Sequence, residues 1–380
     1  MDNIYNQHPY MMIAIAAIVA FVTTLVVVPQ IISFSHKKSL LDKPDHRKQH
    51  KQPIPTMGGI GIFAGLALSS FVWMGSLSLE EAVSISISII ILLITGVLDD
   101  LKGLSAGKRL LIQVLAGVIV AHIGIILHIP AGFMGISHVS PVLEYCLTVF
   151  LIAGVTNSFN LIDGIDGLAG GIGFINAVIF GVLFVFLGFI PFALLAFSFA
   201  AALLAFLKYN FNPAKIFMGD TGSLVLGFLM VTFGIKIVCI SATLPTANTL
   251  LLLVFSLLLL PVIDTARVFL FRALKQKSPF SADRSHIHHL LLKTGLDHRK
   301  AAALLYAANI LLAIESFLLR NLRLEYAMCI LVISAIVCIE LLSIRRLLKM
   351  GKQMEFMDSD FKKMSTDNQL LIKYLDTKKK

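Results

Sequence analysis

The chain alternates between long runs of apolar residues and short polar segments almost from its beginning to its end. About eleven of these runs approach the roughly 20 residues that a helix needs to cross a bilayer. Their limits lie near 10–34, 57–75, 82–98, 110–128, 142–158, 168–189, 191–207, 222–240, 247–266, 301–319 and 325–343. Only the segment Gly188–Pro191 separates the sixth run from the seventh. We therefore predict an all-α fold, a polytopic membrane helix bundle of about eleven transmembrane helices.

The composition supports a membrane protein, because 57% of the residues are hydrophobic and only 14% are charged. Soluble domains carry about 25% charged residues. The first run lacks a preceding basic segment and a small-residue cleavage site, so we expect a retained helix. The four cysteines lie inside apolar runs, without the spacing of a zinc site. We divide the chain into a transmembrane domain with cytoplasmic catalytic loops, 1–343, and a basic cytoplasmic tail, 344–380.

Most of the 32 lysines and arginines lie in every second loop and in the tail. Because basic loops stay in the cytoplasm, this bias predicts an N-terminus outside and a C-terminus inside a plasma or inner membrane. Orientation and attraction to anionic lipids account for the net charge of +10, so we expect no nucleic-acid partner.

Five aspartates stand at the ends of apolar runs, and the order of crossings puts all five on the cytoplasmic side. They are Asp99 and Asp100 in GVLDD, Asp163 and Asp166 in NLIDGIDGLAGG, and Asp220 in FMGDTGS. Carboxylates beside hydrocarbon are costly and usually functional. Each motif alone also fits a solvated helix end or a turn. Together they favour a shared site for a cation and phosphates.

Magnesium is the cation that this pattern favours, with manganese as the alternative. Magnesium takes oxygen ligands and binds through one or two carboxylates plus substrate phosphates. We expect Asp100, Asn160 and Asp220 to supply the protein ligands, and Asp163 to face the substrate. The glycines of the DGIDGLAGG motif would let backbone N–H groups approach a phosphate.

A second polar cluster lies in the segment SADRSHIHHLLL between the ninth and tenth runs. It contains Arg284, His286, His288 and His289. We interpret them as donors that neutralise a diphosphate. The alternatives are a surface basic patch or a zinc site, but the segment has no cysteine and no HExxH pattern. Lys51, after the first run, either meets an anionic substrate or only sets the topology.

The motifs GVLDD, NSFNLIDGIDGLAGG, YNFNPAKIFMGDTGS and HIHH resemble those of the polyprenyl-phosphate N-acetylhexosamine-1-phosphate transferases. The resemblance covers nearly the whole chain. These enzymes move a sugar-1-phosphate from a UDP-sugar to a membrane polyprenyl phosphate and release UMP. The resemblance implies that Asp220 binds magnesium with help from Asn160. It also implies that Asp99 or Asp100 is a candidate base.

The same resemblance implies a nucleotide site. Asp166 would contact the uracil, Phe217 would stack on it, and Asn210 matches another nucleotide position. The three histidines would meet the diphosphate and the sugar. The position of Lys102 and the reading HIHHLLLKTG depart from the peptidoglycan-precursor branch. Both departures favour the branch that uses UDP-N-acetylglucosamine.

The expected reaction transfers N-acetylglucosamine-1-phosphate to undecaprenyl phosphate, as the first membrane step of teichoic acid or another surface polysaccharide. The active site would face the cytoplasm. A phospho-N-acetylmuramoyl-pentapeptide transferase is the alternative within the enzyme class. A transporter or ion channel is the alternative outside it, although such proteins place carboxylates near the bilayer midplane. Direct attack by the lipid phosphate, covalent catalysis by Asp99 and a homodimer all stay open.

Overall fold

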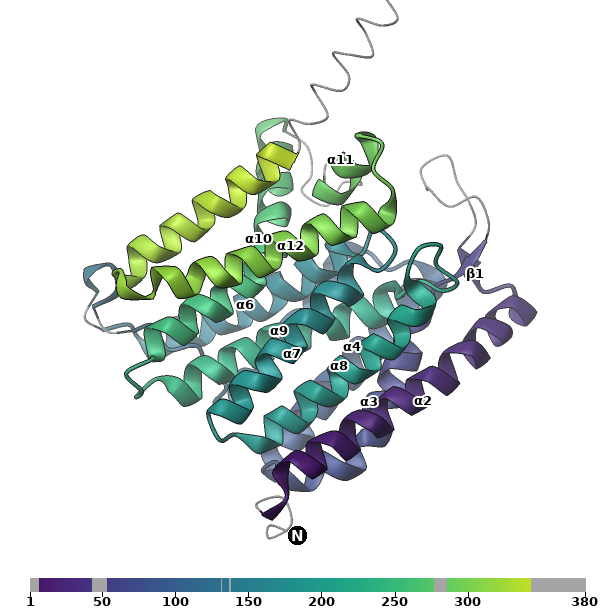
Figure 1. Cartoon of the computed structure of the whole chain (residues 1–380), viewed down its shortest axis with the longest axis horizontal. Helices are drawn as coiled ribbons and strands as arrows, with labels where there is room; N and C mark the ends of the chain where they lie inside the picture. Colours follow the sequence, from purple (N-terminus) through teal and green to yellow (C-terminus); the bar gives the residue numbers. More distant parts are fainter. Residues whose placement is uncertain (1–6, 43–52, 131, 137, 277–285, 343–380) are drawn as a thin grey trace, which may run out of the picture.

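The computed structural model describes residues 7–42, 53–130, 132–136, 138–276 and 286–342. Its helices lie side by side with their long axes roughly aligned (Figure 1). The first six are α2 (Pro9–Lys38), α3 (Gly58–Trp73), α4 (Leu79–Lys102), α5 (Ala106–His122), α6 (Pro141–Ile162) and α7 (Leu168–Phe186). They are followed by α8 (Ile190–Asn210), α9 (Gly219–Ser241), α10 (Ala247–Leu274), α11 (Ile287–Lys293), α12 (His298–Leu318) and a last helix, Leu324–Leu342. Short 3-10 turns lie at Met74–Ser76, Phe133–Gly135 and Leu319–Asn321.

Each predicted apolar run corresponds to one of these helices, and the all-α membrane bundle is confirmed. Within the described residues, nine helices are long and apolar enough to cross a membrane, whereas α3 and α5 are shorter. The sixth and seventh runs are two separate helices, because Gly188 at φ 71° ends α7. The predicted limit of the fourth run, residue 128, is wrong, since α5 ends at His122.

Helix α9 is the centre of the bundle and packs against α3, α4, α6, α7 and α10. Glycines make this close packing possible. A side chain on Gly59 of α3 would collide with the backbone of Gly222, and one on Gly96 of α4 would collide with Thr221. The backbones of α3 and α4 therefore lie directly against the first turn of α9, as small residues allow in membrane helices.

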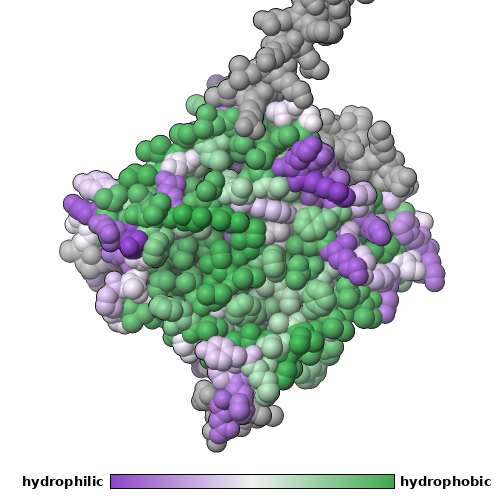
Figure 2. Space-filling view, viewed as in Figure 1, coloured by the Kyte–Doolittle hydropathy of each residue, from purple (hydrophilic) through white to green (hydrophobic). Residues whose placement is uncertain are grey.

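The face of the bundle in Figure 2 is broadly hydrophobic, with polar residues toward its edges. Large side chains such as Phe71, Phe150 and Phe186 are mostly exposed. In water such a surface would be an aggregation liability, whereas in a bilayer it contacts lipid. Inside, Asn176 donates to the carbonyl of Leu257 at 2.8 Å and accepts from Asn309 at 2.8 Å, which links α7, α10 and α12.

A two-stranded antiparallel hairpin precedes α3. Its strands are β1 (Leu41–Asp42) and β2 (Ile54–Pro55), with Leu41 opposite Pro55. The carbonyl of Pro55 accepts the N–H of Phe217 at 2.8 Å, and the N–H of Gly58 donates to the carbonyl of Phe217 at 3.0 Å. These bonds join the hairpin to the segment that leads into α9.

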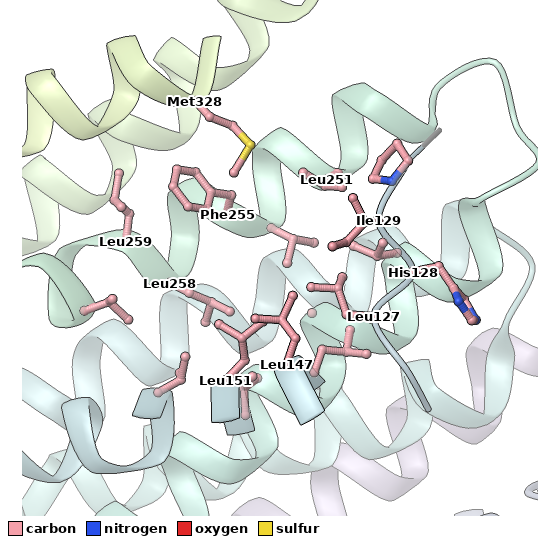
Figure 3. Close-up of a pocket in the computed structure, with 18 of the residues that line it drawn as sticks. Leu127, His128, Ile129, Leu147, Leu151, Leu251, Phe255, Leu258, Leu259 and Met328 are labelled. Atoms are coloured by element: carbon pink, nitrogen blue, oxygen red, sulfur yellow. The ribbon is translucent and has the colours of Figure 1, made fainter. Parts of the chain in front are cut away.

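An apolar cavity of about 340 Å³ lies between α6, α9, α10 and the last helix. Leu151 of α6, Phe255 and Leu258 of α10, and Met328 of the last helix line it (Figure 3). The loop that contains His128 closes one side, where the His128 Nδ1 lies 2.8 Å from Glu144 Oε2.

Candidate functional site

Three helix ends that carry predicted site residues meet at one end of the bundle. Asp100 lies in the last turn of α4, Asn160 in the last turn of α6, and Asp220 in the first turn of α9. The Nδ2 of Asn160 donates to Oδ1 of Asp220 at 2.9 Å, and the N–H of Asp220 donates to Oδ1 of Asp100 at 2.9 Å. The predicted convergence of distant acidic segments is therefore confirmed.

Asp100 caps the N-terminus of α9. Besides the N–H of Asp220, it accepts the N–H of Thr221 at 3.2 Å and the Thr221 hydroxyl at 2.6 Å, both through Oδ2. The first amides of a helix lack partners within it, and a carboxylate there also gains from the helix dipole. Gly219 lies at φ 70°, and a side chain on it would strike Asp100 and the carbonyl of Thr56. Both oxygens of Asp100 already accept hydrogen bonds in this cap. The predicted role of Asp100 as a metal ligand stays a prediction.

Arg109 joins two of the carboxylates, and the sequence analysis missed it. Its Nη1 lies 2.8 Å from Oδ2 of Asp99 and 2.6 Å from Oδ2 of Asp220. The other oxygen of Asp99 accepts the N–H of Leu104. The sequence places Arg109 in a basic segment that serves as a topology signal, whereas the structure places it in the first turn of α5. Its position four residues before a buried polar residue, Gln113, is the one local hint that it faces inward.

Asp163 follows α6 and lies among other carboxylates. Burial raises its pKa to about 8, and the negative charges of Asp220, Asp100 and Asp166 act in the same direction. Among the described residues, its carboxylate makes no side-chain hydrogen bond. Without a nearby cation, Asp163 therefore holds a proton at neutral pH.

Asp166 connects three segments of the chain. Its Oδ2 accepts Asn212 Nδ2 at 2.8 Å and the N–H of Ala214 at 3.1 Å, and its Oδ1 lies 3.2 Å from His298 Nδ1. Burial acts to raise its pKa, but the hydrogen bonds from His298 and Asn212 outweigh that effect and lower the pKa. His298 is a second residue that the sequence analysis missed.

Asn210, the last residue of α8, contacts the loop that contains Asp166. Asn210 accepts the N–H of Gly167 at 2.9 Å and donates to the carbonyl of Ile216 at 2.8 Å. Phe217 is partly buried at the turn before α9. The nucleotide contacts predicted for Asp166, Asn210 and Phe217 stay predictions. The amides of Gly167 and Leu168 are already bonded, and the predicted approach of a phosphate to the other amides of this turn stays a prediction.

The histidine segment is anchored by Asp264 of α10, which is not among the predicted site residues. Asp264 Oδ2 lies 2.8 Å from His286 Nδ1, and its Oδ1 accepts the N–H of Ile287 at 3.0 Å. Arg267 Nη2 also donates to Oδ1 at 3.1 Å. His286 and Asp264 are almost fully buried, so the predicted direct contact of His286 with substrate does not follow from its placement.

His288 lies against the turn that contains Asp163. Its Nε2 occupies the space that a side chain on Gly164 would fill. Its ring stacks on His286, with centroids 5.8 Å apart, and lies 4.3 Å from the ring of His289. Burial, followed by the charge of His289, lowers the pKa of His288 well below 6.5. His288 is therefore neutral at physiological pH, whereas His289 is partly exposed at the edge of the cluster.

The remaining two predicted site residues, Arg284 and Lys51, lie outside the described residues.

Comparisons with known proteins decide the family. The sequence model of glycosyl transferase family 4 matches residues 82–238. The chain is 34% identical to a probable undecaprenyl-phosphate N-acetylglucosaminyl 1-phosphate transferase of Bacillus subtilis, over 81% of this chain and 85% of that protein. The chain belongs to glycosyl transferase family 4.

Two further relatives agree with this assignment. One is a decaprenyl-phosphate N-acetylglucosaminephosphotransferase of Mycolicibacterium smegmatis, 32% identical over 69% of this chain and 71% of that protein. The other is an undecaprenyl-phosphate alpha-N-acetylglucosaminyl 1-phosphate transferase of Escherichia coli K12, 32% identical over 73% and 76%. This family 4 glycosyl transferase is therefore a multi-pass membrane enzyme that transfers a sugar phosphate, and the transporter interpretation is not supported.

The donor set of the family 4 site suits a hard cation that arrives with phosphates. Within the described residues, no three His, Cys, Asp or Glu side chains form a ready-made metal site. The carboxylates of Asp99 and Asp220 nevertheless share the guanidinium of Arg109, and the charge of Asp220 acts on the nearby Asp163. Magnesium typically needs only one or two carboxylates when substrate phosphates and water complete its shell, so these residues fit it.

Proposed function

We propose that the protein transfers N-acetylglucosamine-1-phosphate from UDP-N-acetylglucosamine to undecaprenyl phosphate and releases UMP. The observation that carries this proposal is the meeting of Asp220, Asn160 and Asp99 at one end of the bundle, with His288 against the Gly164 turn that follows α6. The names of the relatives support the sugar and the lipid. The distribution of basic residues supports a site that faces the cytoplasm. The product would begin a surface polysaccharide such as teichoic acid.

Magnesium, or manganese in its place, is the proposed cofactor. Asp220 would hold it, with Asp163 and the carbonyl oxygen of Asn160 as further oxygen donors. Asp100 contributes less, because its oxygens cap α9. When bound, the cation neutralises the diphosphate and stabilises the departing UMP.

The proposed reaction is a direct displacement. An oxygen of the lipid phosphate forms a bond to the sugar-linked β-phosphorus, and the bond from that phosphorus to the bridging oxygen breaks, so that UMP leaves with the electron pair. A phosphate monoester has a second pKa of about 6, so little deprotonation is needed at neutral pH. Both oxygens of Asp99 are engaged, by Arg109 and by the N–H of Leu104. This engagement favours direct attack over a covalent Asp99 intermediate. Phosphoryl transfer mainly requires alignment and charge neutralisation.

The apolar cavity supplies a path for the lipid tail. Val155 of α6 and Val262 of α10 line it. Asn160 lies five residues after Val155 and Asp264 two residues after Val262, each further along the same helix toward the site end. A lipid whose phosphate reaches the acidic cluster would therefore place isoprenoid units against this cavity, where burial of apolar surface stabilises binding.

Release of UMP by the purified protein tests the proposal. The assay contains undecaprenyl phosphate, magnesium and either UDP-N-acetylglucosamine or UDP-N-acetylmuramoyl-pentapeptide. Asp220→Asn should lower kcat by at least about 100-fold, because it removes charge stabilisation from the transition state. Glu80→Gln, exposed at the opposite end of the bundle, is the matched control. Wild-type turnover by Asp220→Asn would contradict the assigned site, and release from the muramoyl substrate alone would identify the other branch.

A further inference from the structure

Asp264 and His286 form a buried pair beside the proposed site. Asp264 is 1% exposed and His286 4% exposed. Their side chains meet at 2.8 Å, between Asp264 Oδ2 and His286 Nδ1. The other carboxylate oxygen accepts the N–H of Ile287, the first residue of α11, and the guanidinium of Arg267. The Asp264 carboxylate thus holds the His286 side chain, the first residue of α11 and the guanidinium of Arg267 together.

This pairing defines the orientation of the His286 ring. A carboxylate only accepts hydrogen bonds, so Nδ1 must carry the hydrogen. Nε2 then points away from Asp264 into the protein, where it meets no hydrogen-bond partner among the described residues. The ring plane lies 10° from that of His288, and His288 in turn abuts Gly164 beside Asp163. A continuous set of contacts therefore runs from Asp264 to the acidic turn.

We propose that Asp264 and His286 are positioning residues that hold His288 and His289 against the Gly164 turn, and that His286 does not contact the substrate. This inference rests on the proposed function for its kinetic readout. Partners that orient a functional histidine typically change activity by about 10- to 100-fold when they are replaced. Burial of the pair explains why the effect would act through His288 and His289.

Two replacements of His286 distinguish the positioning role from direct catalysis. His286→Asn places an amide N–H near Nδ1 and retains the bond to Asp264, whereas His286→Gln places it near Nε2 and loses that bond. We expect His286→Asn to keep a kcat within about threefold of wild type. We expect His286→Gln and Asp264→Asn each to lower kcat by about 10- to 100-fold with an unchanged KM for the UDP-sugar. The double variant should be no worse than either single variant.

Hydrogen exchange provides a readout that does not depend on activity. Amides of α11 should exchange faster in His286→Gln and Asp264→Asn than in wild type, and at the wild-type rate in His286→Asn. If wild-type protein releases no UMP from any UDP-sugar, the proposed function fails, but the exchange comparison still decides the pairing. Activity in His286→Gln together with its loss in His286→Asn would show that Nε2 meets the substrate. That result, or an Asp264→Asn protein with wild-type kinetics and exchange, would overturn the inference. If Asp264→Asn does not fold, the His286 comparison alone decides.

Discussion

Replacement of Arg109 by methionine tests how the acidic cluster is held together. Arg109 lies between Asp99 and Asp220, at 2.8 Å and 2.6 Å. Methionine keeps much of the apolar stem and removes the charge. The carboxylates would then face one another without this guanidinium, and Asp163 would add a further negative charge if it ionised. We expect a less stable protein whose stability depends more strongly on a divalent cation.

The magnitude follows from the burial of the three groups. The side chains of Arg109, Asp99 and Asp220 are 28%, 8% and 25% exposed. At an effective dielectric constant of 20, a pair of charges 4 Å apart gains about 4 kcal/mol, before desolvation is subtracted. Removing one partner of a fully buried pair costs about 3–5 kcal/mol. Because Arg109 is partly exposed, we expect a loss of about 2–3 kcal/mol. This loss corresponds to a fall of about 3 °C in the midpoint of thermal unfolding.

The measurement is the fraction of monodisperse protein that survives heating in detergent, with and without magnesium. Lys108→Met is the matched control, because Lys108 is the adjacent exposed cation. Magnesium should raise the midpoint of Arg109→Met more than that of wild type, since it neutralises the same carboxylates. The reasoning is refuted if Arg109→Met and Lys108→Met have equal midpoints and equal responses to magnesium.

Three further predictions concern the cation, the histidines and the lipid. A cation binds the ionised form of Asp163, whose pKa is about 8. Magnesium affinity measured by calorimetry should therefore rise with pH until about pH 8 and then level off. Asp163→Asn should flatten this rise. His289→Ala should lower kcat by at least about tenfold, whereas His122→Ala, exposed at the far end, should not. Leu258→Trp should fill part of the cavity and raise KM for a long-chain acceptor more than for a short-chain one; equal effects on both would contradict the proposed path.

The helices could be predicted from the sequence because hydrocarbon imposes a simple rule. A backbone inside a bilayer must satisfy its own hydrogen bonds, so long apolar runs become helices. Their ends were less certain, since they depend on local features. Helix α5 stops at His122, just before Gly124 at φ 85°. Helix α10 continues past the predicted limit at 266 to Leu274, and Arg272 in this extension is buried.

The convergence of the acidic motifs could also be predicted, because an even or odd number of crossings decides which face a helix end occupies. The partners of those residues could not. Arg109 meets Asp220 at a separation of 111 residues, and His298 meets Asp166 at one of 132. A basic residue in a cytoplasmic loop gives the same topology signal whether it faces water or a carboxylate. Apart from the helical spacing of Arg109 and Gln113, the local sequence does not distinguish Arg109 and His298 from their neighbours.

The aspartates differ most in how many of their oxygens the fold already uses. Asp166 and Asp264 each bind several groups of their own chain, which is the work of a structural carboxylate. Asp220 is held by Asn160 and by Arg109. Asp163 has its charge suppressed by burial and, among the described residues, makes no side-chain hydrogen bond. A carboxylate of this kind gains most from an arriving cation, because the cation offsets both the burial and the neighbouring charges. We therefore expect the cation to bind beside Asp163, whose carboxylate makes no side-chain hydrogen bond among the described residues.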